Sequence, residues 1–235
     1  MVPAPLVAEL RAAQQGLVRL TDADITEFFR SMDLRRPEQT RDLLIEFVAL
    51  LVAQNGLAGA AAAADWFEEA REAERVPGTY RAGPADLALE DDVESAVRYS
   101  AGHLWSPTPE LMLPSMLKEV SKLVLAPARE TVVRSSEDDR RAVGWQRVTR
   151  AGSCKFCRML ASRGAVYRER TVDFAAHGFC GCAAIPSWDQ DAPEVDVRAY
   201  SASARTAGMT PTQRAAHDAR VRRYVAQMDD PADRT

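Results

Sequence analysis

The sequence predicts a mainly α protein, with a helical N-terminal body and a small Cys/His-rich α+β module toward the C-terminus. Three observations predict this class. Apolar residues recur at helical spacing through about the first 140 residues. The helical pattern fades after Trp145, where glycines appear, and all four cysteines lie between Cys154 and Cys182. The predicted divisions are a helical domain over residues 1–143, the module over 144–190 and a polar tail over 191–235.

Two amphipathic segments begin the helical body. In TDADITEFFRSM, Thr21 or Asp22 is a typical N-cap. Pro37 suits the first turn of the next helix. The apolar stripe of that helix is wide enough to indicate burial on more than one side. Its members are Leu43, Leu44, Phe47, Val48, Leu50 and Leu51.

Three more helical segments complete the body. An alanine-rich helix in GLAGAAAAADWFEEAREAERV ends at VPG. A helix from about residue 92 to 103 ends before SPTPE, and a helical group from about residue 110 continues around Pro114 and Pro127 to about 141.

Beyond Trp145, CRMLASRG predicts a short helix, and AVYRE and CAAIP predict short strands. In the tail, MTPTQRAAHDARVRRYVAQM predicts an exposed helix with Thr210 as N-cap and Pro211 at its first position.

The composition is that of a soluble globular protein, and the net charge of -4 gives no whole-protein argument for nucleic-acid binding. The N-terminus has no basic start followed by an apolar core, so we expect no signal peptide. The longest uncharged run, 47–64, contains Gln54 and Asn55 and makes a poor membrane span. We therefore expect no membrane partner and synthesis in the cytoplasm, where clustered thiols are more often metal ligands or catalytic groups than disulfides.

The spacing of the cysteines predicts a metal site. The pattern is Cys154-x2-Cys157, nineteen intervening residues, then His177-x2-Cys180-x-Cys182. Two such pairs can surround one tetrahedral zinc ion, and neighbouring glycines suit the tight turns that this requires. Five candidate ligands compete for four positions. The expected set is Cys154, Cys157 and Cys180 with either His177 or Cys182, and the zinc is expected to be structural.

Other interpretations of the cluster stay open. Two disulfides would form if the mature protein left the reducing cytoplasm. A catalytic thiol would need a base and an orienting partner, and the sequence gives no clear third member. The pattern of the zinc deaminases is absent, because no H-x-E precedes the C-x-x-C pair. A redox C-x-x-C would need a strand-helix-strand context, which the helical first half does not provide.

Positive charge is concentrated around the cluster. Residues 146–182 contain seven basic and two acidic residues. These basic residues either offset the charge of the thiolates or contact nucleic-acid phosphate, such as packaged DNA, or an acidic protein face. The candidates for a DNA contact are Arg147, Arg150, Arg158 and Arg163.

Two stretches carry a resemblance to a known family. GWQRVTRAGSCKFCRMLASRGAVY followed by HGFCGCAAIP resembles the C-terminal region of the MuF-like minor capsid (head morphogenesis) proteins of tailed phages, above all those of actinobacteria. AAAADWFEEAREAERVPGTYRAGPAD resembles their helical N-terminal part. The resemblance covers roughly residues 60–188, and its Cys/His pattern falls on the five candidate ligands named above.

The resemblance implies a virion protein without catalysis. Such a protein is carried in few copies inside the head, associated with the portal protein and the inner capsid shell. It supports head assembly and DNA packaging or ejection. It would lie in the host cytoplasm during assembly and then in the virion. The alternative is an enzyme that acts on nucleic acid or protein through the Cys/His cluster.

Overall fold

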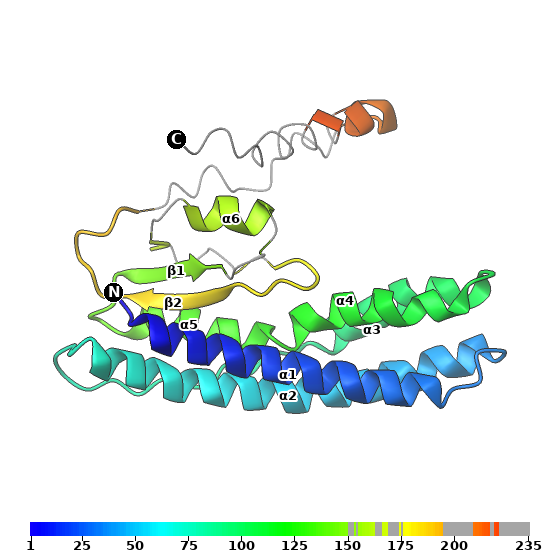
Figure 1. The fold of residues 1–235 in the computed structure, drawn as a ribbon, viewed down its shortest axis with the longest axis horizontal. Helices are drawn as coiled ribbons and strands as arrows, with labels where there is room; N and C mark the ends of the chain where they lie inside the picture. The colour runs from blue at the N-terminus through cyan, green and yellow to red at the C-terminus, as the bar shows by residue number, and fades with distance from the viewer. Residues whose placement is uncertain are drawn as a thin grey trace.

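The computed structural model describes residues 1–149, 153, 155–162, 166–168, 174, 176–194, 209–216 and 219–220. The protein is mainly α, as predicted, and is built in layers (Figure 1). Two long helices, α1 (Ala4–Arg30) and α2 (Pro37–Ala73), lie side by side along the body. The second layer consists of α3 (Glu90–Ala101), η1 (Gly102–Trp105), η2 (Pro109–Leu111), α4 (Met112–Leu123) and α5 (Ala126–Asp138).

A two-stranded antiparallel sheet covers α5. Strand β1 (Gly144–Val148) pairs with β2 (Ala183–Ser187), and α6 (Lys155–Ser162) lies on the other side of the sheet (Figure 1). The predicted strand in CAAIP and the predicted helix in CRMLASRG are both confirmed. Of AVYRE, Val166 and Tyr167 form isolated bridges with Glu194 and Trp145.

Two apolar clusters form the core. One, at the far end of the bundle, is built by α1 to α4 around Val48, Val97 and Met116. The other joins α1, α2 and α5 to both strands, and it includes Leu10, Phe67, Val132, Trp145 and Ile185. The sheet therefore shares its core with the helical body, and a domain boundary at residue 143 stays a prediction.

The first helix is longer than expected. Thr21 is buried in its interior, where its hydroxyl donates to the Leu17 carbonyl and accepts a hydrogen bond from Asn55. The predicted N-cap at Thr21 or Asp22 is therefore wrong, because the threonine satisfies its hydroxyl within the helix. Pro37 does begin α2, as predicted.

Helix α2 is the central element of the body. It is also, within the described residues, the one helix long and apolar enough to cross a membrane by length and composition. The sequence predicts that residues 47–64 make a poor membrane span, whereas the length and composition of the whole helix pass this test. In the structure α2 packs against α1, α3 and α5, which accounts for the apolar face that it buries.

A buried ion pair links the ends of α2, α5 and β2. The Arg71 Nε donates to Asp139 Oδ2 at 3.0 Å, and the Trp188 indole N–H donates to the same oxygen at 2.9 Å. The other guanidinium N–H groups of Arg71 donate to the three backbone carbonyls of residues 76–78. The VPG turn that ends the alanine-rich helix is thereby held against the sheet.

The helix in the tail begins as predicted. Residues 211–216 are helical, and the Gln213 N–H donates to the Thr210 hydroxyl at 3.3 Å. The Gln213 side chain accepts a hydrogen bond from the Thr210 N–H in return. This reciprocal pair is a capping box and confirms Thr210 as the N-cap.

Gly144 starts β1 in a conformation that other residues rarely adopt. Its φ is +139°, and a Cβ at this position would collide with the Tyr167 carbonyl oxygen. We expect Gly144→Ala to lower the free energy of unfolding by about 1–3 kcal/mol, because of the strained backbone conformation alone. Urea denaturation monitored by circular dichroism measures this. Gly83→Ala is the control, since nothing lies within 4 Å of a Cβ there; equal stability losses in both variants would contradict the prediction.

Candidate metal site

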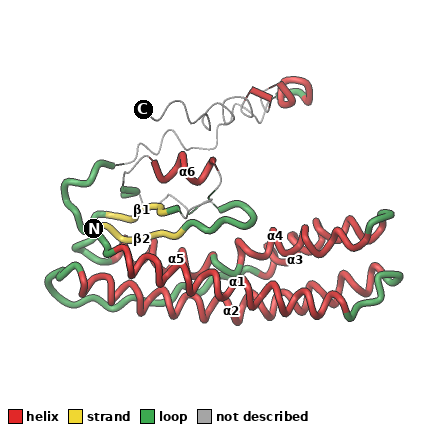
Figure 2. The backbone as a smooth tube through the Cα atoms, in the orientation of Figure 1, coloured by secondary structure: helices red, strands yellow, loops and turns green. Residues whose placement is uncertain are grey.

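The cysteines and the histidine are brought together by three pieces of the module. Cys157 lies on α6, His177 and Cys180 lie in the loop before β2, and Cys182 immediately precedes β2. Figure 2 shows this loop at the end of the sheet, next to the helical body. We call residues 176–182 the knuckle segment. Cys154, the fifth predicted ligand, lies outside the described residues.

Three of the five predicted ligands meet at one point, and His177 contacts one of them. The Sγ atoms of Cys157, Cys180 and Cys182 all lie within 4.8 Å of one another. The Cys157 and Cys180 sulfurs are 3.6 Å apart, and the His177 Nε2 is 3.1 Å from the Cys157 sulfur. All three cysteines are buried, and no disulfide joins any two of them.

These separations suit a tetrahedral zinc ion. With Zn–S bonds of about 2.3 Å, two sulfurs on one tetrahedral ion lie about 3.8 Å apart. The observed sulfur pair is within a few tenths of an ångström of that value. Three buried thiols and an imidazole also form the kind of donor set that zinc prefers. The three cysteines can therefore hold a metal ion, and His177 lies in contact with one of them.

The histidine is oriented as a metal ligand would be. Its Nδ1 lies 2.7 Å from the Gly178 carbonyl oxygen, so Nδ1 carries the proton and Nε2 offers its lone pair to the cluster. Metal-binding histidines almost always donate their second ring N–H to a carbonyl or carboxylate. This contact selects Nε2 as the donor atom.

A buried arginine supports the cluster from the helical body. Arg129 on α5 is 2% exposed. Its guanidinium donates to the Cys180 carbonyl at 2.5 Å and to the Cys182 carbonyl at 3.2 Å, and it lies 5.0 Å from the Phe174 ring. The backbone on both sides of Gly181 is thus fixed, and a positive charge is held beside the thiols.

The metal-free thiols do not share one protonation state. A hydrogen bond with Cys182 lowers the pKa of Cys180 to about 4, and the nearby charge of Arg129 contributes further. The same hydrogen bond and burial raise the pKa of Cys182. Cys180 is therefore the thiolate of the pair, with Cys182 as its hydrogen-bond donor, and a cation entering the site would meet a ligand that is already deprotonated.

The knuckle segment docks onto the end of α4. The Phe179 N–H donates to the Ser121 hydroxyl at 2.9 Å. Gly178 comes so close to α4 that a Cβ there would lie 2.7 Å from the Lys118 carbonyl oxygen. Only a glycine allows this approach, which is why HGFCGC carries one at this position.

The arginines proposed for a DNA contact differ in exposure. Arg147 is 6% exposed, and its guanidinium lies 3.8 Å from the Phe174 ring, so it faces the interior. The predicted phosphate contact has no support at this residue in the observed conformation. Arg158 is exposed on α6. Arg150 and Arg163 lie outside the described residues.

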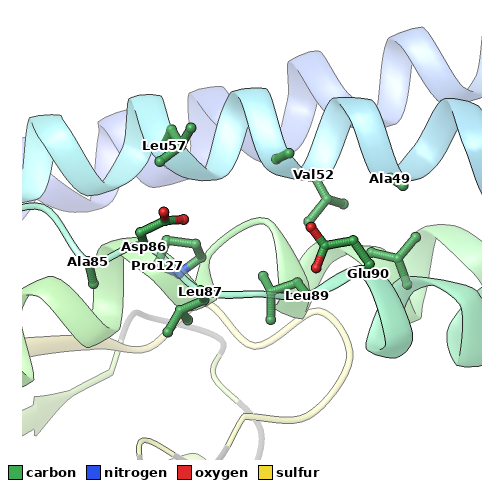
Figure 3. Close-up of a pocket in the computed structure, with 11 residues that line it drawn as sticks. Ala49, Val52, Leu57, Ala85, Asp86, Leu87, Leu89, Glu90 and Pro127 are labelled. Carbon is green, nitrogen blue, oxygen red and sulfur yellow. The ribbon is translucent and has the colours of Figure 1, made fainter.

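A separate pocket, with no cysteine in its lining, lies between α2 and the segment before α3. Figure 3 shows Asp86 and Glu90 opposite the apolar side chains of Ala49, Val52 and Leu57. The two carboxylates come from one short segment, and none of the residues that line this pocket is a histidine or cysteine. The lining of this pocket therefore lacks the sulfur and nitrogen ligands that make the Cys/His cluster a candidate zinc site.

Arg129 is the supporting residue that the cysteine pattern did not indicate. A signal for it does exist: Arg129 follows Leu125 and Ala128 and precedes Val132 and Val133, all buried along one face of α5. A single arginine within an apolar stripe predicts a buried charge with specific partners.

We expect Arg129→Met to weaken zinc binding by about 10–100-fold, the usual cost of removing a group that orients metal ligands. Competition with a chromophoric chelator measures the affinity. Arg134→Met, on the same helix but half exposed and paired with Glu130, is the matched control and should leave the affinity unchanged. Equal affinities in the two variants would show that Arg129 has no part in the site.

Comparison with known proteins gives one result. The family model described as VG15 protein matches residues 1–207. No curated protein matches the chain, and no solved structure does. The matched region includes the helical body and the whole cysteine cluster.

Proposed function

Because the chain belongs to the VG15 protein family, whose name indicates a viral gene product of phage origin, we propose that it is a minor capsid protein of a tailed phage. In this proposal it lies inside the head at the portal vertex. It supports head assembly and DNA packaging or ejection, as the resemblance to MuF-like proteins implies. The portal protein and the inner shell are its proposed partners.

The observation that carries the proposal is the buried Cys/His cluster in a helical chain of this family. Three buried cysteines lie around one point, and the His177 Nε2 contacts one of them, so the protein can supply a fourth donor itself. A structural site fills all four positions with protein ligands, whereas a catalytic zinc keeps one position for water or substrate. We infer a stabilising role for the cluster and no catalysis.

Zinc is the proposed occupant. Cys157, Cys180, Cys182 and the His177 Nε2 would hold it, and Arg129 would offset the negative charge of the thiolates. Bound zinc would supply free energy of folding to a module whose described part consists of a two-stranded sheet and the short helix α6. Purification under reducing conditions, followed by metal analysis and a free-thiol count, tests this. About one zinc per chain, with thiols that react only after chelation, supports the proposal; four free thiols without metal contradict it.

The role in the head is tested on particles. Purified phage heads are treated with a lysine-reactive cross-linker and analysed by mass spectrometry. The protein should be present in far fewer copies than the major shell protein, and its cross-links should join it to the portal protein. Absence from DNA-filled heads, or cross-links only to tail proteins, would contradict the proposal.

The enzymatic alternative has one observation in its favour, the lowered pKa of Cys180. Iodoacetamide labelling of the protein as purified distinguishes the two functions. A structural site protects all thiols until a chelator is added. A single cysteine that reacts without chelator, well below the ordinary thiol pKa, would favour an enzyme.

A further inference from the structure

A second site lies next to the knuckle segment, on the side of α1. A pocket of about 180 Å³ opens between α1, the junction of α4 and α5, and the loop that leads into β2. Figure 1 shows α1 running past that junction. We call it the α1 pocket. It is lined by Arg11, Gln14, Gln15, Val18, Arg19, Ser121, Leu125, Phe179, Cys180 and Gly181.

The α1 pocket contains a buried donor that has no acceptor. Gln14 is 5% exposed, and among the described residues its side-chain Nε2 has no hydrogen-bond partner. Buried amide groups are almost always hydrogen-bonded, because an unmade bond costs the full desolvation of the group. Because Gln14 lines the pocket, an acceptor that occupies the pocket would satisfy this donor.

The charge of the lining defines that acceptor. Arg19, on the turn of α1 that follows Gln14, contributes a positive charge to the lining. Arg11, on the preceding turn, also lines the pocket and has other contacts. Among the described residues that line the pocket, none carries a carboxylate, and the Cys180 thiolate is already paired with the Cys182 thiol and the Arg129 charge. The Arg19 guanidinium and the Gln14 amide donor, both in the lining, favour an anion.

The apolar residues of the lining indicate which chemical group is attached to the anion. Val18, Leu125 and Phe179 offer carbon surface, and Phe179 is 54% exposed. Phe179 has a φ of 58°, which is unusual for a bulky residue, and its N–H is fixed by the Ser121 hydroxyl. The protein thus holds an aromatic ring at the surface beside two arginines. Such a ring packs against the methylene groups of a ligand.

We propose that the α1 pocket binds a glutamate side chain of a protein partner. The carboxylate would accept hydrogen bonds from Gln14 Nε2 and Arg19, and its two methylenes would lie against Val18 and Phe179. A small pocket with an amide at 5% exposure suits a single side chain. The phosphates of a DNA duplex lie on a wide, continuous backbone and do not enter such a pocket. This inference goes beyond the role of the Cys/His cluster and does not require it.

The test is an NMR titration of the full-length protein as purified. The probe is N-acetylglutamate α-amide, and its neutral counterpart N-acetylglutamine α-amide has nearly the same shape. We expect the charged probe to shift the side-chain amide signals of Gln14 saturably, with a dissociation constant on the order of 1 mM. The neutral probe should bind at least about tenfold more weakly, since a charged acceptor is lost.

Two variants and a control locate the binding. Gln14→Leu and Arg19→Ala should each weaken binding of the charged probe by roughly tenfold, followed by backbone signals near Phe179. Arg30→Ala, at the other end of α1, should leave binding unchanged. Equal binding of both probes, no effect of the two variants, or no saturable shift would overturn the proposal.

A final arm distinguishes the source of the anion. Inorganic phosphate and a short DNA duplex are added in competition with N-acetylglutamate α-amide. Failure of both to displace the probe supports a protein partner. Displacement by the duplex, or tighter binding of phosphate than of the probe, would assign the pocket to a phosphate ligand and overturn the proposal.

Discussion

Asp139→Ala is expected to lower the free energy of unfolding by about 3–5 kcal/mol, because it leaves the buried Arg71 charge without its partner. The side chains of Arg71 and Asp139 are 8% and 3% exposed, so water cannot replace the lost carboxylate. Trp188 loses the acceptor of its indole N–H in the same variant. Urea denaturation followed by circular dichroism gives the change.

An exposed ion pair provides the control for this variant. Glu94 and Arg98 form a salt bridge on the surface of α3 with side chains about half exposed. Glu94→Ala should cost about 0–1 kcal/mol. The double variant Arg71→Met with Asp139→Leu should recover most of the loss, since a well-packed apolar pair can replace a buried ion pair. A loss in Asp139→Ala no larger than in Glu94→Ala would mean that the ion pair does not hold the turn.

Removal of the metal is expected to release residues 144–194 while the helices of the far end stay folded. Metal-binding free energy in such sites reaches about 10–16 kcal/mol in isolated zinc fingers, and here it would stabilise the segments that carry the ligands. Hydrogen exchange measured by mass spectrometry, with and without chelator, locates the change. Protection should fall in β1, α6 and β2 and persist around Val48 and Met116, which lie in the other apolar cluster.

Cysteine variants separate a metal effect from an effect of the chelator itself. Cys154→Ser with Cys157→Ser, and separately Cys180→Ser with Cys182→Ser, should loosen the same residues without chelator. Further addition of chelator should then have no effect. If limited proteolysis cuts these variants in residues 145–188 no faster than the parent protein, the cluster does not stabilise the module.

The sequence predicts the helical body well and the sheet only in part. The apolar periodicity places the helices, but it does not place the start of α1. Threonine favours both N-cap positions and hydrogen bonds to the preceding turn of a helix, so Thr21 alone does not distinguish the two. Strand β1 was not predicted. The five residues GWQRV are too few for an alternation of apolar and polar residues to distinguish a strand from a loop. The partner strand β2 also lies far along the chain. Pairing at that distance depends on tertiary contacts that local patterns do not contain.

The metal site follows a similar division. Spacing alone predicts that Cys157, His177 and Cys180 come together, because two short turns can each supply a pair of ligands to one ion. Spacing does not indicate Arg129, which comes from a helix more than twenty residues earlier. Arg129 donates hydrogen bonds to backbone carbonyls. Every residue has a backbone carbonyl, so no residue type in the sequence indicates these contacts.

The shared core also sets an order of folding during synthesis. The cluster of Val48, Val97 and Met116 is complete once the ribosome has made the first 123 or so residues, so it can form first. The cluster around Leu10 and Phe67 needs Ile185, which emerges later. We therefore expect the nascent chain to form the first cluster while the apolar residues of the second cluster stay exposed. A chaperone could bind this exposed apolar surface until β2 has been synthesised.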